Sequence, residues 1–243
     1  MTLNGSYLRA VFELYLKENS SYYAKYLRDE LMFLSSTFAR ENVLIIGLPD
    51  LLREGRGEGG VFAFLHFGNF FLSGAALCEK LGVEYTAIAS KVNMQFMSEE
   101  ENAFWEMVHA NASACYSRKL FFTSDYPKSM IDWVKAGKFL GVAMDVDEQG
   151  KRNKRTCFEF LGKTVFLQTS AARIAKIARK PLIPMTIVFC PIRRRHKLFL
   201  GKPIEVTDVV DASCLVLKSV EQIIKGHEYQ FFHDIHQTFQ SAN

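Results

Sequence analysis

The chain has 243 residues, of which 49% are hydrophobic and 23% charged, and its formal net charge is +4. This length suits one large α/β domain or two small ones, with ample apolar side chains for a core. So small a net charge, without any recognised nucleic-acid module in the sequence, argues against nucleic acid as a partner. The 21 phenylalanines favour apolar grooves or a membrane-facing patch in addition to a core.

The cysteines and the N-terminus bear on compartment and cofactors. The five cysteines are scattered, none forms a C-x-x-C pair, and an odd count does not suit a disulfide framework. No Cys and His residues have metal-ligand spacing, so we expect reduced thiols and no bound metal. The first 21 residues lack the basic region and apolar core of a signal peptide. We therefore expect a cytoplasmic protein, with attachment to a membrane surface left open.

Residues 1–40 are predicted to form a helical segment packed on the main domain, which we place at 41–243. Apolar residues recur at helical spacing over 7–15 and again over 22–34, with an interruption at the Ser20-Ser21 pair. The alternative interpretation is that the same aromatic faces lie on a membrane surface.

Beyond residue 41, short apolar runs alternate with helix-like segments. Strands are predicted over 43–47, 61–65, 83–89, 114–116, 139–144, 182–189 and 198–206. Helices are predicted over 48–54, 70–81, 99–110, 127–136, 169–178 and 211–239, the last with a break near residues 226–227. This alternation predicts an α/β fold with a mixed, largely parallel sheet flanked by helices.

The stretch 59–78 contains no charged residue and a single histidine, His66. Its glycines and polar residues make it a poor membrane span. Val61 to Leu65 is apolar enough for a strand buried on both faces, and the Gly68-Asn69 pair is typical of a turn before the helix at 70–81.

His66 would therefore lie where a strand ends and a helix begins. Backbone amides at a helix start favour negative charge. A titratable base beside such a turn fits an acyl-transfer site. The alternative is a structural histidine at a strand end.

Charged clusters follow two of the predicted strands. Asp145, Asp147 and Glu148 follow the strand at 139–144, and a basic loop runs from Lys151 to Arg155. A second basic cluster covers 193–197. Both basic clusters are either solvated turns or a docking surface for an acidic carrier protein, a phosphate or anionic lipid headgroups.

Four blocks of the sequence resemble one known family. HFGNFF at 66–71 resembles the H-F-G-N-W-E block of the lipid A biosynthesis acyltransferases, which belong to the wider glycerolipid acyltransferase group with its H-x4-D/E motif. Residues 145–184 resemble that family's acidic turn, basic loop, Phe-Phe-Gly turn and small-residue helix. SKVN at 90–93 and the segment 223–236 are similar to two further blocks. Together the blocks span residues 43 to 239 in family order.

The resemblance implies an acyltransferase that takes a fatty acyl group from acyl carrier protein or coenzyme A, with no bound cofactor. By this resemblance the protein would act in lipid metabolism, in the cytoplasm or at the periphery of the inner membrane. His66 would be the general base that activates a hydroxyl or amine acceptor. The oxyanion and substrate would contact Gly68, Asn69, Phe71, Lys91, Asn93, Phe160 and Gly162. Carrier or phosphate would dock on Lys151, Arg152, Arg155 and Arg194.

The sequence departs from the family where the motif requires an acid, five residues after the histidine, because Phe71 stands there. Such a carboxylate orients the imidazole and stabilises its protonated form. Three explanations remain open. A carboxylate from elsewhere substitutes, with Asp145 the best candidate; or a backbone carbonyl orients His66; or the protein binds acyl chains or a carrier without turnover. A thioesterase on the same scaffold is a further alternative.

Overall fold

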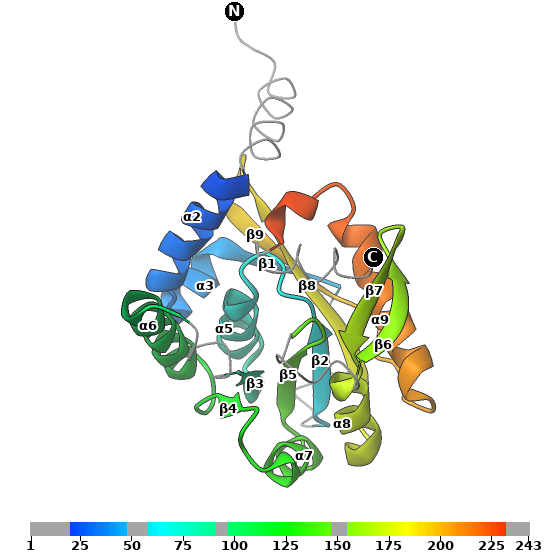
Figure 1. Cartoon of the computed structure of the whole chain (residues 1–243). Helices are drawn as coiled ribbons and strands as arrows, with labels where there is room; N and C mark the ends of the chain where they lie inside the picture. The colour runs from blue at the N-terminus through cyan, green and yellow to red at the C-terminus, as the bar shows by residue number, and fades with distance from the viewer. Residues whose placement is uncertain (1–19, 48–57, 91–96, 147–154, 232–243) are drawn as a thin grey trace, which may run out of the picture.

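The computed structural model describes residues 20–47, 58–90, 97–146 and 155–231 (Figure 1). The strands are β1 Val43–Ile46, β2 Gly60–Phe64, β3 Tyr85–Ala89, β4 Phe121–Phe122, β5 Phe139–Ala143, β6 Arg155–Phe160, β7 Lys163–Gln168, β8 Leu182–Cys190 and β9 Arg195–Leu200. The helices are α2 Ser20–Met32, α3 Ser36–Asn42, α5 Phe70–Leu81, α6 Glu99–Cys115, α7 Pro127–Lys135, α8 Ser170–Ala178 and α9 Val209–Ile224, followed by the 3-10 turn η3 Glu228–Gln230.

Seven strands form one sheet in the order β1-β9-β8-β2-β5-β3-β4, and β6 and β7 form a separate antiparallel hairpin. Within the large sheet every neighbouring pair is parallel except β8 and β9. The predicted α/β class with a mixed, largely parallel sheet is confirmed.

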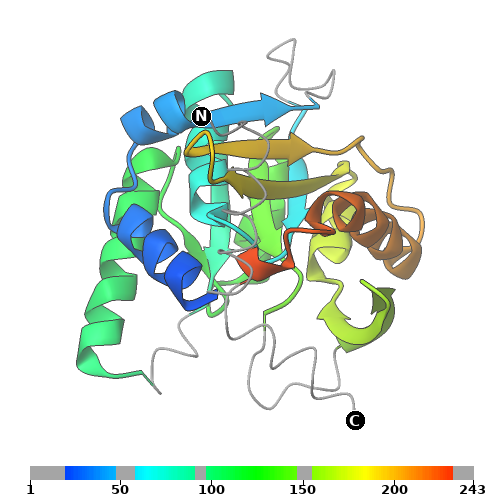
Figure 2. The same ribbon diagram turned by 90° about the horizontal axis from the view of Figure 1, so that it is seen from above.

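Helices cover both faces of this sheet. Seen from above, the blue and green ribbons of α2, α3 and α6 lie on one side and the orange α9 on the other (Figure 2). Strand β2 contributes to both cores, because alternate residues of a strand point to opposite faces. Phe62 and Phe64 pack with α5 and α6, whereas Val61 and Ala63 pack with α7, α8 and α9. All five residues of β2 are buried, as the apolar run predicted.

The helix after β2 forms where its sequence predicts it. α5 spans Phe70–Leu81, and Gly82 follows it in the left-handed conformation, with φ of 62°. A glycine takes this conformation without strain, so it ends the helix.

Two predicted strands need correction. The strand predicted over 114–116 is wrong, since α6 starts from a capping box at Ser98 and Glu101 and runs on to Cys115. The strand predicted over 198–206 begins earlier and ends at Leu200, since β9 starts at Arg195. Charged residues obscured its start in the sequence, yet burial alternates along it.

The described part of the N-terminal segment holds the two helices α2 and α3, and the interruption predicted at Ser20-Ser21 falls where the described residues begin. Helix α2 begins at Ser20 and ends at Met32, and Ser35 then caps the start of α3. The predicted segment boundary at residue 40 lies inside α3, which runs on to Asn42 and directly into β1. The predicted helix at 48–54 and the helical positions before residue 20 lie outside the described residues.

The closing segment after α9 returns to the centre of the sheet. The predicted break near residues 226–227 is confirmed, because α9 ends at Ile224 and η3 begins at Glu228. Phe231 then forms an antiparallel bridge with Phe67. Within the part of the chain that the structure describes, no helix combines the length and the apolar character that a membrane span needs.

Gln230 anchors this closing segment to β8. Its side chain is fully buried and accepts from the backbone N–H of Phe189 at 2.8 Å, while its amide donates to the Phe189 carbonyl at 2.9 Å. The backbone carbonyl of Gln230 in turn accepts from the N–H of Gly68 at 3.0 Å. One residue thus joins the end of the chain to β8 and to the turn after β2.

We predict that Gln230→Ala lowers the free energy of unfolding by about 2–4 kcal/mol, because it leaves two buried backbone groups of Phe189 without partners. Urea denaturation measures this change. The matched control is Gln222→Ala on the exposed side of α9, which should change the free energy by less than about 0.5 kcal/mol. Equal effects of the two substitutions would contradict the anchoring role.

Candidate active site

His66 and Asp145 meet because they follow neighbouring parallel strands in register. Phe64 of β2 pairs with Ala143 of β5, and Met144 N–H donates to the Phe64 carbonyl at 2.9 Å beyond the strand ends. Two further residues along each strand bring His66 opposite Asp145. The carboxyl ends of parallel strands are also where α/β folds commonly place their sites.

The Asp145 carboxylate holds His66 by two contacts. Its Oδ1 lies 2.8 Å from the imidazole Nδ1, and its Oδ2 accepts from the His66 backbone N–H at 2.8 Å. The Asp145 side chain is fully buried, whereas the His66 side chain is 28% exposed. An ionised carboxylate only accepts hydrogen bonds, so Nδ1 is the donor in this contact, and in the neutral imidazole Nε2 then keeps a lone pair. This arrangement can serve a general base.

Aromatic rings further restrict the imidazole. The Phe70 ring meets it edge-on with centroids 4.7 Å apart, and Phe64 lies 6.4 Å away in a similar orientation. Phe64 and Phe70 stack on each other at 5.7 Å. The imidazole plane is therefore set by the Asp145 carboxylate and by packing against Phe70 at the start of α5.

Phe71, where the family motif has its acid, points toward α6 instead. Phe71 is only 7% exposed, and its ring lies near His109 and Trp105, at centroid distances of 6.0 and 6.4 Å. Its carbonyl accepts from the Tyr116 hydroxyl at 2.8 Å, and burial raises the pKa of Tyr116, which keeps that hydroxyl protonated. The carboxylate that contacts His66 comes from Asp145 on the neighbouring strand, in line with the first of the three explanations above.

The predicted role of the Gly68 amide in holding an oxyanion is wrong, because this N–H already donates to the Gln230 carbonyl. The glycine itself is required, since its φ is 58° and a Cβ would come within 2.3 Å of the Ile187 carbonyl oxygen. Asn69 is buried, and its side chain caps α5 by accepting from Leu72 N–H at 3.1 Å. The backbone amide of Asn69 stays a candidate for the oxyanion.

The structure does not bring Phe160 and Gly162 to His66. Phe160 is buried in the core on the sheet face opposite Phe64, and Gly162 is exposed in the β6–β7 turn with φ of 71°. The hairpin needs this glycine for its turn, and Phe160 for its packing against the domain. Their predicted contact with the substrate stays a prediction.

The predicted basic docking residues are only partly described. The docking residues Lys151 and Arg152 lie outside the described residues, as do the predicted substrate-contact residues Lys91 and Asn93 and the acidic residues Asp147 and Glu148. Arg155 is the first residue of β6, opposite Gln168 of β7. Gln168 N–H donates to the carbonyl of Met144 at 2.8 Å, so this end of the hairpin adjoins Asp145.

Arg194 lies in the β8–β9 turn, at the same edge of the sheet as His66. β8 is parallel to β2, with Ala63 opposite Pro184, which places Ile187 level with His66. Cys190 lies three residues further along, roughly 10 Å beyond it at 3.3 Å per residue. Arg194 follows in the turn, exposed to solvent.

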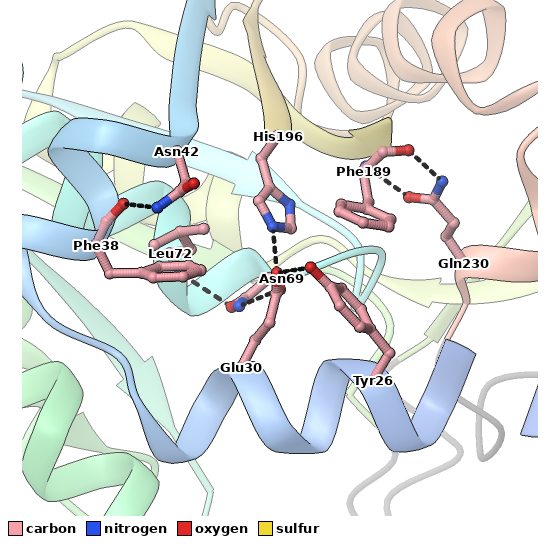
Figure 3. A network of polar contacts seen from close by, with 9 residues as sticks. All are labelled: Tyr26, Glu30, Phe38, Asn42, Asn69, Leu72, Phe189, His196 and Gln230. Carbon is pink, nitrogen blue, oxygen red and sulfur yellow. Dashed lines mark hydrogen bonds and ion pairs between the residues drawn. The ribbon is translucent and has the colours of Figure 1, made fainter. Parts of the chain in front are cut away.

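Sequence reasoning missed a buried polar network beside the turn at 66–69, centred on Glu30 (Figure 3). Glu30 lies on the buried face of α2 and contacts Asn69, Tyr26 and His196. The signal was its position three residues after Leu27, on the apolar stripe of the helix.

Within the described ranges, no three His, Cys, Asp or Glu residues gather in a way that could hold a metal ion.

Comparison of the chain with known protein families finds a match, whereas comparison with individual curated proteins does not. Residues 16–241 match the family of the bacterial lipid A biosynthesis acyltransferase, and the match includes both His66 and Asp145. Since this range covers nearly the whole sequence, the chain belongs to the bacterial lipid A biosynthesis acyltransferase family.

Proposed function

We propose that this protein transfers a fatty acyl group from an acyl-carrier-protein or coenzyme A thioester to a hydroxyl or amine acceptor, with His66 as general base and Asp145 as its orienting carboxylate. The observation that carries the proposal is the 2.8 Å contact between His66 Nδ1 and the buried Asp145 carboxylate. Membership of an acyltransferase family supplies the reaction class.

In the proposed reaction, His66 Nε2 removes the proton from the acceptor O–H or N–H as that atom attacks the thioester carbonyl carbon. A C–O or C–N bond forms and the carbonyl oxygen becomes negative. The C–S bond then breaks, and the departing sulfur takes the proton from Nε2. Asp145 stabilises the transient imidazolium through Nδ1–H, as in other carboxylate–histidine pairs.

The start of α5 supports stabilisation of the oxyanion. Amides in the first turn of a helix carry partial positive charge, and the Asn69 amide lies three residues after His66. Donors of this kind are usually the largest electrostatic contribution in acyl transfer. We assign this role to Asn69 N–H in place of Gly68 N–H.

The location we propose is the cytoplasm or the periphery of the inner membrane, where fatty acyl carriers and lipid acceptors meet. The protein carries no cofactor in this proposal, since the acyl thioester is a co-substrate. The acceptor is defined only by its chemistry, a hydroxyl or an amine.

We predict that His66→Ala and Asp145→Asn each lower the rate of thiol release from an acyl thioester by roughly a hundred- to ten-thousand-fold, because they remove the base and its orienting acceptor. The assay follows thiol release from acyl-carrier-protein and acyl-coenzyme A of several chain lengths, with and without hydroxyl and amine acceptors. Asp132→Asn, an exposed carboxylate on α7, is the matched control and should leave the rate unchanged.

Other outcomes of this assay would each revise the proposal. Equal release by wild type and His66→Ala would exclude His66 as the base. Release to water alone, unaffected by any acceptor, would indicate a thioesterase. Binding of acyl-carrier-protein without any release would indicate a homologue that binds its carrier without turnover.

The basic β8–β9 turn supports docking of an acidic carrier protein. It carries Arg193, Arg194 and Arg195, all exposed, at the edge of the sheet where His66 lies. Complementary charge at the rim of an interface mainly accelerates association and makes it sensitive to salt. A salt-dependent association rate therefore distinguishes an acidic carrier protein from a small thioester, which presents far fewer charges.

We predict that Arg194→Glu raises the KM for acyl-carrier-protein by roughly tenfold at low salt, with kcat and the KM for acyl-coenzyme A within about twofold of wild type. Lys202→Glu is the control with the same charge change, since Lys202 is exposed just after β9, at the opposite edge of the sheet. An equal rise for both donors would point to the phosphate they share. Vesicle binding lost in Arg194→Glu, with both KM values unchanged, would point to anionic lipid.

A further inference from the structure

Glu30 is a buried carboxylate that receives three hydrogen bonds from three separate parts of the chain. Oε1 accepts from the Tyr26 hydroxyl at 2.6 Å and lies 2.9 Å from His196 Nε2 on β9. Oε2 accepts from Asn69 Nδ2 at 3.3 Å. Figure 3 shows Glu30 rising from α2 into the space between these groups. Only 7% of Glu30 is exposed, and burying a carboxylate is unfavourable unless such partners compensate.

The orientation of Asn69 follows from its second contact. Asn69 Oδ1 accepts from Leu72 N–H to cap α5, so Nδ2 is the atom that faces Glu30. A carboxylate at position 30 and an amide at position 69 are therefore complementary, whereas two carboxylates there would repel each other.

Residues Gly68 and Asn69 of the segment 66–69 are both held by elements that are distant in the sequence. Gly68 N–H donates to Gln230 at the end of the chain, and Asn69 donates to Glu30 on α2. His66 itself is held by Asp145. Because Asn69 is three residues from His66 and starts α5, its placement determines where the first amides of that helix lie relative to the imidazole.

Other titratable groups also face Glu30. His196 is fully buried beside Phe189, and its Nδ1 has no hydrogen-bond partner among the described residues. Burial, and next the charge of Glu30, raise the pKa of Tyr23 well above its usual value. Neither group contacts His66 in the network, so Asn69 is the link from Glu30 to the candidate catalytic segment.

We propose that Glu30 is a positioning residue for the segment 66–69, acting through Asn69, and that helix α2 is thereby a working part of the active site. This inference rests on the proposed function, because it assigns a role to Glu30 in the same site. Glu30 touches no reacting atom; it fixes the cap of α5, from which Phe70 packs on the His66 ring, and with it the Asn69 N–H to which we assign the oxyanion.

The test exchanges the two groups. Asn69→Asp keeps the helix cap, which aspartate provides well, but turns a carboxylate oxygen toward Glu30. We expect kcat to fall at least tenfold with KM within about twofold. In the double variant Glu30→Gln with Asn69→Asp, the amide and carboxylate change places, and kcat should return to within about threefold of wild type. Rescue shows that the effect arises from the contact between positions 30 and 69, and thermal melting separates a loss of folding from a loss of positioning.

The matched control is Asn42→Asp, which also removes an amide donor, here one that bonds to the Phe38 carbonyl at 3.0 Å on α3. It should leave kcat unchanged. Thermal melting of every variant identifies any that fail to fold. If Asn69→Asp does not fold, Asn69→Ser keeps a cap without the donor to Glu30, and it should lower kcat severalfold.

A measurement without turnover separates this inference from the proposed function. NMR of the imidazole resonances, with His66 assigned by comparison with His66→Ala, should show His66 shifted in Asn69→Asp and restored in the double variant. Wild-type kcat and an unchanged His66 signal in Asn69→Asp would overturn the positioning role. Failure to rescue in the double variant would do the same. Activity independent of His66, with the signal still shifted and restored, would overturn only the proposed function.

Discussion

The contact between His66 and Asp145 is the interaction on which the rest of the site depends, and strand register produces it. β2 and β5 are adjacent, parallel and in register, so residues at equal distances past their ends meet at one edge of the sheet. The Asp145 carboxylate binds both the ring and the backbone of His66. If one strand shifted by one residue against the other, His66 and Asp145 would lie on different faces of the sheet and could no longer pair.

The turn that follows His66 is held by parts of the chain that are remote in sequence. Gln230 fixes Gly68, and Glu30 fixes Asn69. Each of these residues also binds β8 or β9, so the sheet supports the turn indirectly from the side opposite Asp145. Short polar anchors from several elements are the usual means of keeping catalytic geometry constant, because a loop alone would be too mobile.

Phe71 shows how a motif position changes without loss of the carboxylate at the histidine. In this chain the position packs into an aromatic group with Trp105 and His109 on α6. The acid reaches His66 from the next strand instead of from the helix start. In this chain the buried acceptor at Nδ1 comes from Asp145, just after β5.

The sequence by itself determined the strand at β2, the helix α5 with its Gly82 cap, the α/β alternation and the position of His66, because these follow from local periodicity and turn chemistry. It also identified Asp145 as a candidate, since an acid after a parallel strand reaches the same edge. Only the tertiary structure decided that Asp145 adjoins His66, because strand order depends on packing of the whole chain. The tertiary structure also decided that Glu30 and Gln230 are anchors, since the burial of a polar side chain depends on residues that are distant in the sequence.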